Sequence, residues 1–375
     1  MGRGIIACAA LVAAFLAGLA SASAQALIEE STFLSVQIDG RPYRLEAMVV
    51  KPAGATGRLP IALITHGRNS SADENAKKRA SDHLPQARDF AHRGWLAVVI
   101  VRRGFGLSEG REPPGVDCVR QNFRDNFERN ADDLAAALAV IARRPDADPR
   151  RVIAAGVSAG GAAALALAAR RPPGLVGVIN VSGGLQLSRA GIPCGFEPGL
   201  IAAFSSFGTR ARVPTLWLYA ENDRLFSPTL VRTLHETYTR AGASADLQMF
   251  PPLSADGHQL WGVFEGRKQW LPALDRFLVT NALPTWDRPA TEAKLFTARL
   301  ATSSRTVVEG YLAAPSEKVL AISQTTRRAF WWAGGELALM RQKSRAACEQ
   351  KTGEPCAIVM ENFELVGVDV QASVR

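Results

Sequence analysis

Val152-Ile-Ala-Ala-Gly-Val-Ser158-Ala-Gly-Gly161 is the stretch that decides the fold. Its first four residues form a short apolar run typical of a buried strand, and the alanine-rich residues 160–170 predict a helix directly after it. Gly156 and Gly160 stand two residues on either side of Ser158, where a side chain would collide as the strand reverses into the helix. Such a strained turn lifts a hydroxyl out of the sheet, so we predict that Ser158 is a catalytic nucleophile.

The motif is short, and it also fits an ordinary strand–helix turn in another α/β domain. A nucleophilic serine needs a general base and an acid that orients the base, which follow an elbow serine in the order acid, then histidine. Asp223 stands in a polar loop after the strand-like run Val213 to Ala220, and His258 follows a second strand-like run that ends at Phe250. The chain therefore carries a candidate triad of Ser158, Asp223 and His258.

Two other acids compete for the orienting role. Asp256 lies in Ala-Asp-Gly, a typical turn, and Glu221 lies at the end of the preceding strand, so we prefer Asp223, which is further out on the loop. The chain has five histidines, and the base is chosen among them by elimination. We expect His66 to pack beneath the site and the remaining three to lie at the surface, at positions 83, 92 and 235.

Strand-like and helix-like segments alternate along the chain, which predicts a mostly parallel sheet with helices on both faces. The expected strands are Ile61 to Thr65, Trp95 to Val101, Val152 to Ala155, Leu175 to Val181, Thr215 to Tyr219 and Leu247 to Phe250. The expected helices are Leu84 to His92, Asn130 to Arg143, Gly160 to Arg170, Pro228 to Ala241 and about Val263 to Leu278. Two earlier runs, Thr32 to Ile38 and Tyr43 to Lys51, are joined through Asp39-Gly40 and predict an antiparallel hairpin at one edge. The fold class is therefore α/β.

Five motifs stand in one order along residues 32–280: His66-Gly67, Arg103-Gly-Phe-Gly-Leu-Ser-Glu-Gly110, the Gly-Val-Ser-Ala-Gly elbow, Glu-Asn-Asp223 and Gly257-His258. With them the chain resembles the α/β-hydrolase superfamily, in particular its dienelactone-hydrolase-like and prolyl-oligopeptidase-like serine esterases. The resemblance implies an oxyanion hole made by the backbone amides of Ala159 and Arg68. Dienelactone hydrolases use cysteine as nucleophile, whereas this elbow has serine, which argues against a dienelactone substrate.

The domain organisation follows from composition. Arg3, the apolar run after it and Ala22-Ser-Ala24 predict a signal peptide over residues 1–24, and hence a periplasmic or secreted protein. Residues 25–282 are expected to form the hydrolase domain, 283–292 a linker and 293–375 a small disulfide-containing α+β module. Within the first, residues 182–213 are expected to form either a short cap, with Phe196, Phe204 and Phe207 as pocket wall, or a surface loop.

Four cysteines remain after Cys8 of the predicted signal peptide, and an oxidising compartment favours their pairing. Cys348 and Cys356 are close together and far from the rest, so we expect them to pair locally, which leaves Cys118 with Cys194. Zinc binding is the alternative, but no second ligand stands at zinc spacing beside any of them, so we expect no metal.

The formal net charge is +9, but no run rich in Lys and Arg interleaves with aromatic residues, so we expect no nucleic acid partner. Arg68, Arg102 and Arg103 gather at strand ends, where they are expected to form scaffold salt bridges or, alternatively, to hold a substrate carboxylate. No segment beyond the signal reaches the roughly 18 apolar residues of a membrane span.

The sequence thus predicts a serine hydrolase that cleaves small-molecule carboxylic esters through an acyl-enzyme, without a cofactor. A peptidase or amidase of the same fold is the first alternative. The second is a catalytically silent protein that binds envelope polymers through the C-terminal module, in which Trp331 and Trp332 stand side by side. Burial of these tryptophans in a small core is the competing interpretation.

Overall fold

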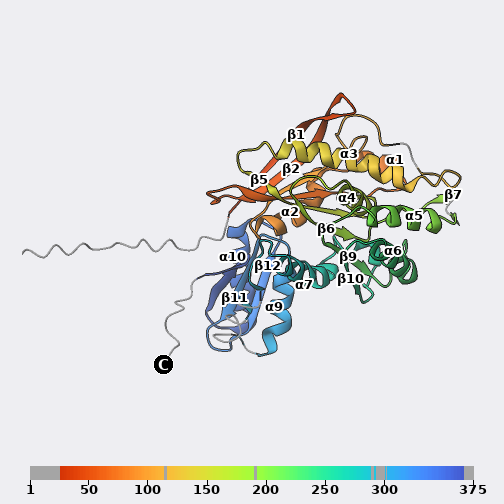
Figure 1. Cartoon of the computed structure of the whole chain (residues 1–375). Helices are drawn as coiled ribbons and strands as arrows, with labels where there is room; N and C mark the ends of the chain where they lie inside the picture. Colours follow the sequence, from red (N-terminus) through yellow and green to blue (C-terminus); the bar gives the residue numbers. More distant parts are fainter. Residues whose placement is uncertain are drawn as a thin grey trace, which may run out of the picture.

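A computed structural model describes residues 26–113, 116–189, 192–288, 291–292, 300 and 302–366. The predicted signal peptide, residues 1–24, lies outside the described residues. Figure 1 shows a large sheet with helices on both sides and, at one end of it beside α7, a smaller sheet with its own helices. No helix among the described residues is long and apolar enough to cross a membrane.

The large sheet has eight strands in the order β1-β2-β4-β3-β5-β6-β9-β10. β2 runs antiparallel to β1 and β4, and all the other neighbours are parallel, as the alternating pattern predicts. The strands are β1 (Leu27–Ile38), β2 (Arg41–Pro52), β3 (Leu59–Thr65), β4 (Leu96–Ile100), β5 (Ala147–Val157), β6 (Leu175–Val181), β9 (Thr215–Ala220) and β10 (Ala245–Phe250). The sheet therefore confirms the α/β class and the antiparallel edge hairpin.

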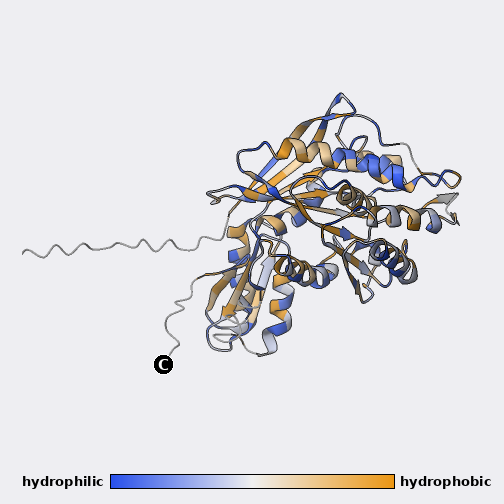
Figure 2. Cartoon of the chain, viewed as in Figure 1, coloured by the Kyte–Doolittle hydropathy of each residue, from blue (hydrophilic) through white to orange (hydrophobic). Residues whose placement is uncertain are grey.

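Helices bury both faces of this sheet. One apolar cluster joins it to α3, α4, α5 and α6, and a second joins it to α2 and α7. Figure 2 shows hydrophobic colour along the strands and hydrophilic colour on outer helix surfaces. The helices are α1 (Ala72–Ala76), α2 (Leu84–Ala91), α3 (Phe123–Ile141), α4 (Ala159–Arg170), α5 (Glu197–Gly208), α6 (Pro228–Arg240) and α7 (Phe264–Thr280), with short 3-10 turns at η1 (Ala80–His83) and η2 (Gly257–Gln259).

The segment 182–213 contains two very short strands and α5, which the sequence did not predict. β7 (Ser188–Arg189) pairs with β8 (Ile192–Pro193), and α5 packs against α6 and α3. Phe204 and Phe207 are fully buried in the core, where the ring of Phe204 lies 5.4 Å from that of Trp217. The expectation that these phenylalanines line the pocket is therefore wrong, because their apolar area is buried between helices and sheet instead.

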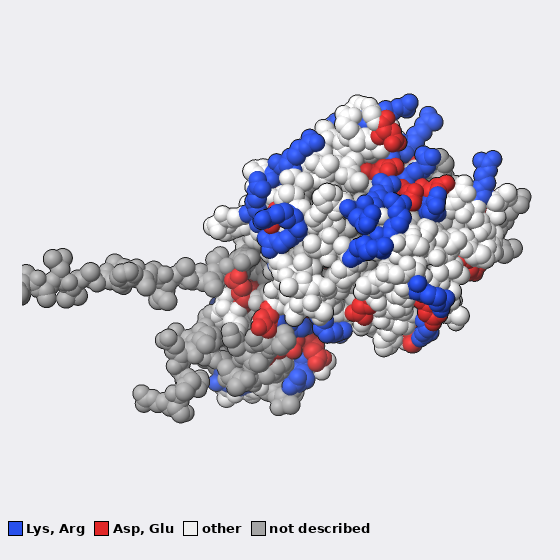
Figure 3. Space-filling model, viewed as in Figure 1, with Lys and Arg blue, Asp and Glu red and all other residues white. Residues whose placement is uncertain are grey.

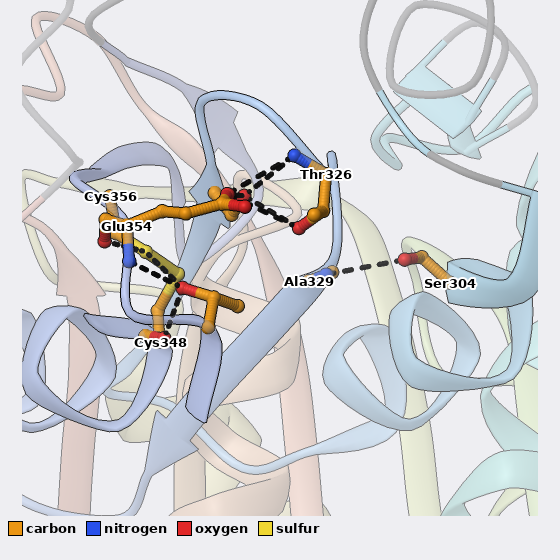
Figure 4. The surroundings of a disulfide bond; sticks show 8 residues. Ser304, Thr326, Ala329, Cys348, Glu354 and Cys356 are labelled. Carbon is orange, nitrogen blue, oxygen red and sulfur yellow. Dashed lines mark hydrogen bonds between the residues drawn. A yellow bond between two sulfur atoms is a disulfide. The ribbon is translucent and has the colours of Figure 1, made fainter. Parts of the chain in front are cut away.

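The second sheet is antiparallel, in the order β12-β11-β13-β14. Its elements are η3 (Thr302–Ser304), α9 (Arg305–Ala313), β11 (Lys318–Ser323), β12 (Ala329–Ala333), α10 (Leu337–Thr352), β13 (Cys356–Glu361) and β14 (Glu364–Leu365). Figure 4 shows the Cys348–Cys356 disulfide joining the end of α10 to β13. Beside it, the Glu354 carboxylate accepts hydrogen bonds from Thr326 and Ser323 and so holds the β11–β12 turn.

Residues that follow α7 pack against the large unit, by which we mean the eight-stranded sheet and the helices that cover it. The indole nitrogen of Trp95 donates to the carbonyl of Pro284 at 2.9 Å, and Arg288 pairs with Asp275 of α7 at 3.1 Å. Trp331 packs partly buried against the core of the small sheet, whereas Trp332 keeps 45% of its surface exposed. The expected burial of the two tryptophans in a small core therefore holds for Trp331 but not for Trp332.

Candidate active site

Ser158 lies on the turn between β5 and α4 with φ 56° and ψ −127°, a backbone conformation that costs energy for any residue except glycine. The turn closes because its neighbours are small. A β-carbon at Gly156 would lie 2.3 Å from the carbonyl oxygen of Gly160, and one at Gly160 would lie 2.4 Å from that of His66. The prediction that a side chain at Gly156 or Gly160 would collide in this turn is thus confirmed. The helix α4 begins immediately after Ser158, with its first amides toward the turn.

Asp223 and His258 meet although 35 residues separate them. Nδ1 of the imidazole lies 3.0 Å from Oδ2 and 3.2 Å from Oδ1 of the carboxylate. Oδ1 also accepts the amides of Leu225 at 2.8 Å and Phe226 at 3.1 Å, which fix the carboxylate from its other side. When Nδ1 donates to Asp223, Nε2 is left unprotonated and is able to accept a proton.

The other two acids considered for this role lie elsewhere. Asp256 accepts the amide of His258 at 3.0 Å and that of Arg224 at 3.1 Å, as a turn residue does. Glu221 is exposed. A β-carbon at Gly257 would lie 2.6 Å from the amide nitrogen of Asp223, so only glycine lets the two loops approach this closely.

Ser158 and His258 both line a cavity of about 880 Å³ at the carboxyl ends of the parallel strands. The loops after β3, β5, β6 and β9 each contribute to its wall, among others through Gly67, Val157, Leu185, Gln186, Leu187 and Leu225. Residues 185–187, rather than the phenylalanines, are thus what the segment 182–213 supplies to the cavity. Its mixed polar and apolar wall suits a small organic substrate.

The turn His66-Gly67-Arg68 after β3 contacts the serine. A β-carbon at Gly67 would lie 3.0 Å from Cβ and 3.6 Å from Oγ of Ser158. His66 is 4% exposed and lies beneath this turn, as expected. Its Nε2 accepts the amide of Arg102 at 3.0 Å, so Nδ1 carries the proton and donates to the carbonyl of Gly67 at 2.7 Å.

Burial, together with the charge of Arg102, holds the pKa of His66 well below its usual value. The ring is therefore neutral at pH 7 and keeps both hydrogen bonds. Arg102 is itself fully buried, and its Nη1 donates to Thr65 Oγ1 at 2.7 Å and to the carbonyl of His66 at 2.5 Å. This network fixes the end of β3, three residues before Arg68, whose amide is an expected oxyanion donor.

The three clustered arginines serve the scaffold, which confirms the preferred interpretation. Arg68 forms an ion pair with Glu112, and Arg103 pairs with the buried Asp133 at 2.6 Å. Arg102 makes the buried hydrogen bonds described above. None of the three is free to serve as a dedicated substrate cation without breaking these contacts.

His83 and Lys78 line the same cavity, and sequence reasoning missed both. His83, expected at the surface, is half-buried with its ring 6.3 Å from that of Trp261, and burial together with Lys78 lowers its pKa to about 4. Lys78 is half-buried, its pKa is lowered by burial, and no carboxylate within the described part of the chain lies in ion-pair distance of it. Neither residue belongs to a motif, so no sequence signal marked them.

His92, also expected at the surface, is half-buried with its ring 5.5 Å from that of Phe363.

Both predicted disulfides are present, Cys118–Cys194 and Cys348–Cys356. The first links the loop before α3 to the start of the α5 segment, where Gln121 Nε2 also donates to the carbonyl of Gly195 at 3.0 Å. It therefore ties the segment that carries residues 185–187 to the rest of the large unit.

Comparisons with known proteins match parts of the chain. Residues 39–195 match the family model described as X-Pro dipeptidyl-peptidase (S15 family), a range that includes Ser158 but neither Asp223 nor His258. A curated relative named "Putative esterase NocK", from Nocardia uniformis subsp. tsuyamanensis, is 33% identical over 145 residues, which are 39% of this chain and 38% of the relative. The chain thus matches well under half of that protein's length.

Solved structures of the same fold include the acylaminoacyl peptidase of Pyrococcus horikoshii, with TM-score 0.50 and 15% identity over 69% of this chain and 43% of that one. The esterase Pf2001 of Pyrococcus furiosus gives a TM-score of 0.47 and 14% identity over 67% of this chain and 90% of that one. At 15% identity, the likeness to the acylaminoacyl peptidase concerns the fold alone.

Proposed function

We propose that this chain, which belongs to the α/β-hydrolase superfamily, is a serine hydrolase that cleaves carboxylic esters with Ser158 as nucleophile, His258 as base and Asp223 as orienting acid. The observation that carries the proposal is the 3.0 Å contact of His258 Nδ1 with Asp223, on the wall of the cavity where Ser158 stands at positive φ. A structural turn would need neither a buried carboxylate on the histidine nor a strained serine facing the same cavity.

The reaction follows from this arrangement. Nε2 of His258 takes the proton of the Ser158 hydroxyl while Oγ attacks the ester carbonyl, and Asp223 stabilises the imidazolium that forms. The amides of Ala159 and Arg68 donate to the oxyanion, and His258 returns the proton to the leaving alcohol. A water molecule, deprotonated by the same ring, then releases the acid and restores the serine.

Esters are favoured over amides by the relative with 33% identity, which is named as an esterase. The family model over residues 39–195, named for a peptidase, supports the alternative that the same site cleaves peptide bonds. The leaving group separates the two, because an amine must receive its proton from His258 before the bond breaks, whereas an alcohol is a better leaving group.

We also propose that the protein acts in the periplasm or outside the cell. Two disulfides within the described residues, together with the predicted signal peptide, support an oxidising compartment. N-terminal sequencing of the protein recovered from a periplasmic extract is expected to begin at Gln25. Recovery of the uncleaved chain in the cytoplasm would contradict this.

Steady-state kinetics test the proposed chemistry. The purified protein is expected to hydrolyse 4-nitrophenyl acetate or butyrate with a higher kcat/KM than Ala-Pro-4-nitroanilide. Asp223→Asn should lower kcat by about 10⁴-fold through loss of the correct tautomer. Faster cleavage of the anilide would favour the peptidase. Turnover of neither substrate by a folded protein would favour the silent binding protein, whose test is binding of an isolated envelope polymer to the small sheet unit.

A further inference from the structure

A second cavity, of about 600 Å³, lies on the large unit and shares no lining residue with the cavity of Ser158. It lies between the β1–β2 turn, the loop after β4 and the exposed side of α3. Its charged and aromatic wall consists of Asp39, Arg41, Tyr43, Arg103, Arg111 and Arg129, together with Glu112. We call it the arginine cavity, because all its cationic lining residues are arginines.

Two of its charged residues are already neutralised. Arg103 pairs with the buried Asp133 at 2.6 Å and lies over the ring of Tyr43, 5.2 Å from its centroid. Glu112 accepts from Arg68 on the side of the catalytic cavity. With these two residues paired, the remaining charged side chains set the charge that a ligand meets.

Three guanidinium groups remain. Arg41, Arg111 and Arg129 are exposed, and within the described ranges none has a carboxylate in ion-pair distance or a hydrogen-bond acceptor in the protein. Of the two carboxylates among the cavity's described lining residues, Glu112 is paired with Arg68, so Asp39 is the one that opposes the three arginines. Figure 3 shows Lys and Arg side chains gathered over the large unit on the visible face, with fewer acidic side chains among them. Like charges that line one cavity repel one another, and a multivalent anion bound among them lowers that cost.

The wall is already formed. The amide of Arg44 donates to the Glu109 carboxylate at 2.9 Å, and the amide of Glu109 donates back to the carbonyl of Arg44 at 2.9 Å. Gly104, at φ +79°, leaves no room for a β-carbon, which would lie 2.0 Å from the amide nitrogen of Glu112. The loop after β4 therefore has little freedom to lose when a ligand binds, which lowers the entropic cost of binding.

We propose that the arginine cavity binds a polyvalent phosphate, held by Arg41, Arg111 and Arg129. Guanidinium forks match the tetrahedral oxygens of phosphate in bidentate fashion, and three of them around one cavity balance more than one negative charge. The shared chemistry is that of phosphoryl oxygens, whether the group is a small free ion or part of a phosphate-bearing polymer. The proposal does not rest on the proposed hydrolysis, since the two cavities share no lining residue.

Calorimetric titration of the full chain with sodium pyrophosphate at fixed ionic strength tests the proposal. The wild type is expected to bind one equivalent, and Arg111→Gln/Arg129→Gln to bind roughly tenfold more weakly or less. The matched control is Arg58→Gln/Arg232→Gln, which removes the same charge from exposed positions outside the cavity and should stay within about twofold of the wild type. Circular dichroism melting should give the same Tm for all three proteins, because every substituted side chain is exposed.

Two further titrations make the result specific. Long-chain polyphosphate that binds more tightly per site than pyrophosphate would assign the site to a polymer, and equal affinity would assign it to a small free phosphate. The proposal is overturned if pyrophosphate shows no saturable binding or if the control loses as much affinity as the cavity variant. Equal or tighter binding of tricarballylate would also overturn it, since the site would then recognise carboxylates.

Discussion

Asp89→Ala should destabilise the whole protein, because it breaks the buried ion pair between α2 and α7. Arg267 Nη1 lies 2.7 Å from Oδ2 of Asp89 and Nη2 lies 2.9 Å from Oδ1, and the two side chains are 3% and 1% exposed. Nε of the same guanidinium donates to the carbonyl of Ala313, in α9 of the small sheet unit, at 2.8 Å. The alanine variant leaves this cation buried without a counter-charge.

The magnitude follows from that loss. Removing one partner of a buried pair costs about 3–5 kcal/mol, because the other charge stays desolvated. An unfolding entropy of about 2.1 cal/mol/K per residue over roughly 340 residues converts this to a fall in Tm of roughly 4–7 °C. Asp89→Leu/Arg267→Met removes both charges and should recover most of the loss, since similar volumes then pack without an unpaired charge.

Differential scanning calorimetry and urea unfolding of the wild type and the two variants provide the measurement. The surface pair Lys77–Glu74, with side chains 71% and 54% exposed, offers the control, and Glu74→Ala should change the free energy of unfolding by less than about 1 kcal/mol. A loss below about 1 kcal/mol for Asp89→Ala, or a double variant less stable than the single one, would refute the reasoning.

Three further perturbations test other parts of the account. Gly160→Ala should abolish ester hydrolysis and lower Tm in a melting curve, because its β-carbon would lie 2.4 Å from the carbonyl oxygen of His66; activity near the wild-type level would contradict this. Burial lowers the pKa of His92 to about 3, so the unfolded chain binds more protons below about pH 6.5, and stability should fall by up to about 1.4 kcal/mol per pH unit toward acid. Urea unfolding at pH 7 and pH 5 should show this slope in the wild type and a smaller one in His92→Gln; equal slopes would argue against it. Cys118→Ser/Cys194→Ser opens a loop of 76 residues and should cost up to about 4.5 kcal/mol, measured by urea unfolding against the disulfide-bonded wild type under non-reducing conditions, and an unchanged midpoint would show that the bridge adds nothing.

Much of the large sheet could be predicted because its strands are buried on both faces. Leu175 to Val181 is an apolar run interrupted only by Gly177 and Asn180, and β6 has the same bounds. The helix over residues 160–170 was predicted from alanine alone, and α4 begins one residue earlier. By contrast, residues 182–213 are rich in glycine and show no clear helical period, so a short cap or a surface loop was expected, whereas tertiary packing against α6 and α3 forms α5 there.

The residues of the candidate site that belong to sequence motifs could be predicted. Ser158, Asp223 and His258 follow in the order that an elbow nucleophile requires, and the structure places the last two in contact. His83, the last residue of η1, and Lys78, just before η1, line the same cavity but belong to no motif, so only the folded chain reveals them. The same limit applies to Arg267 and Asp89, which are 178 residues apart and meet through the packing of α7 on α2.

The central claim, that Ser158 is an activated nucleophile, is tested most directly by incubating the purified protein with a fluorophosphonate probe and mapping the modified peptide by mass spectrometry. We expect a single adduct on Ser158, absent in Ser158→Ala and strongly reduced in His258→Ala, because the hydroxyl needs the imidazole to accept its proton. A folded wild type that remains unlabelled, or an adduct on another serine, would contradict the claim.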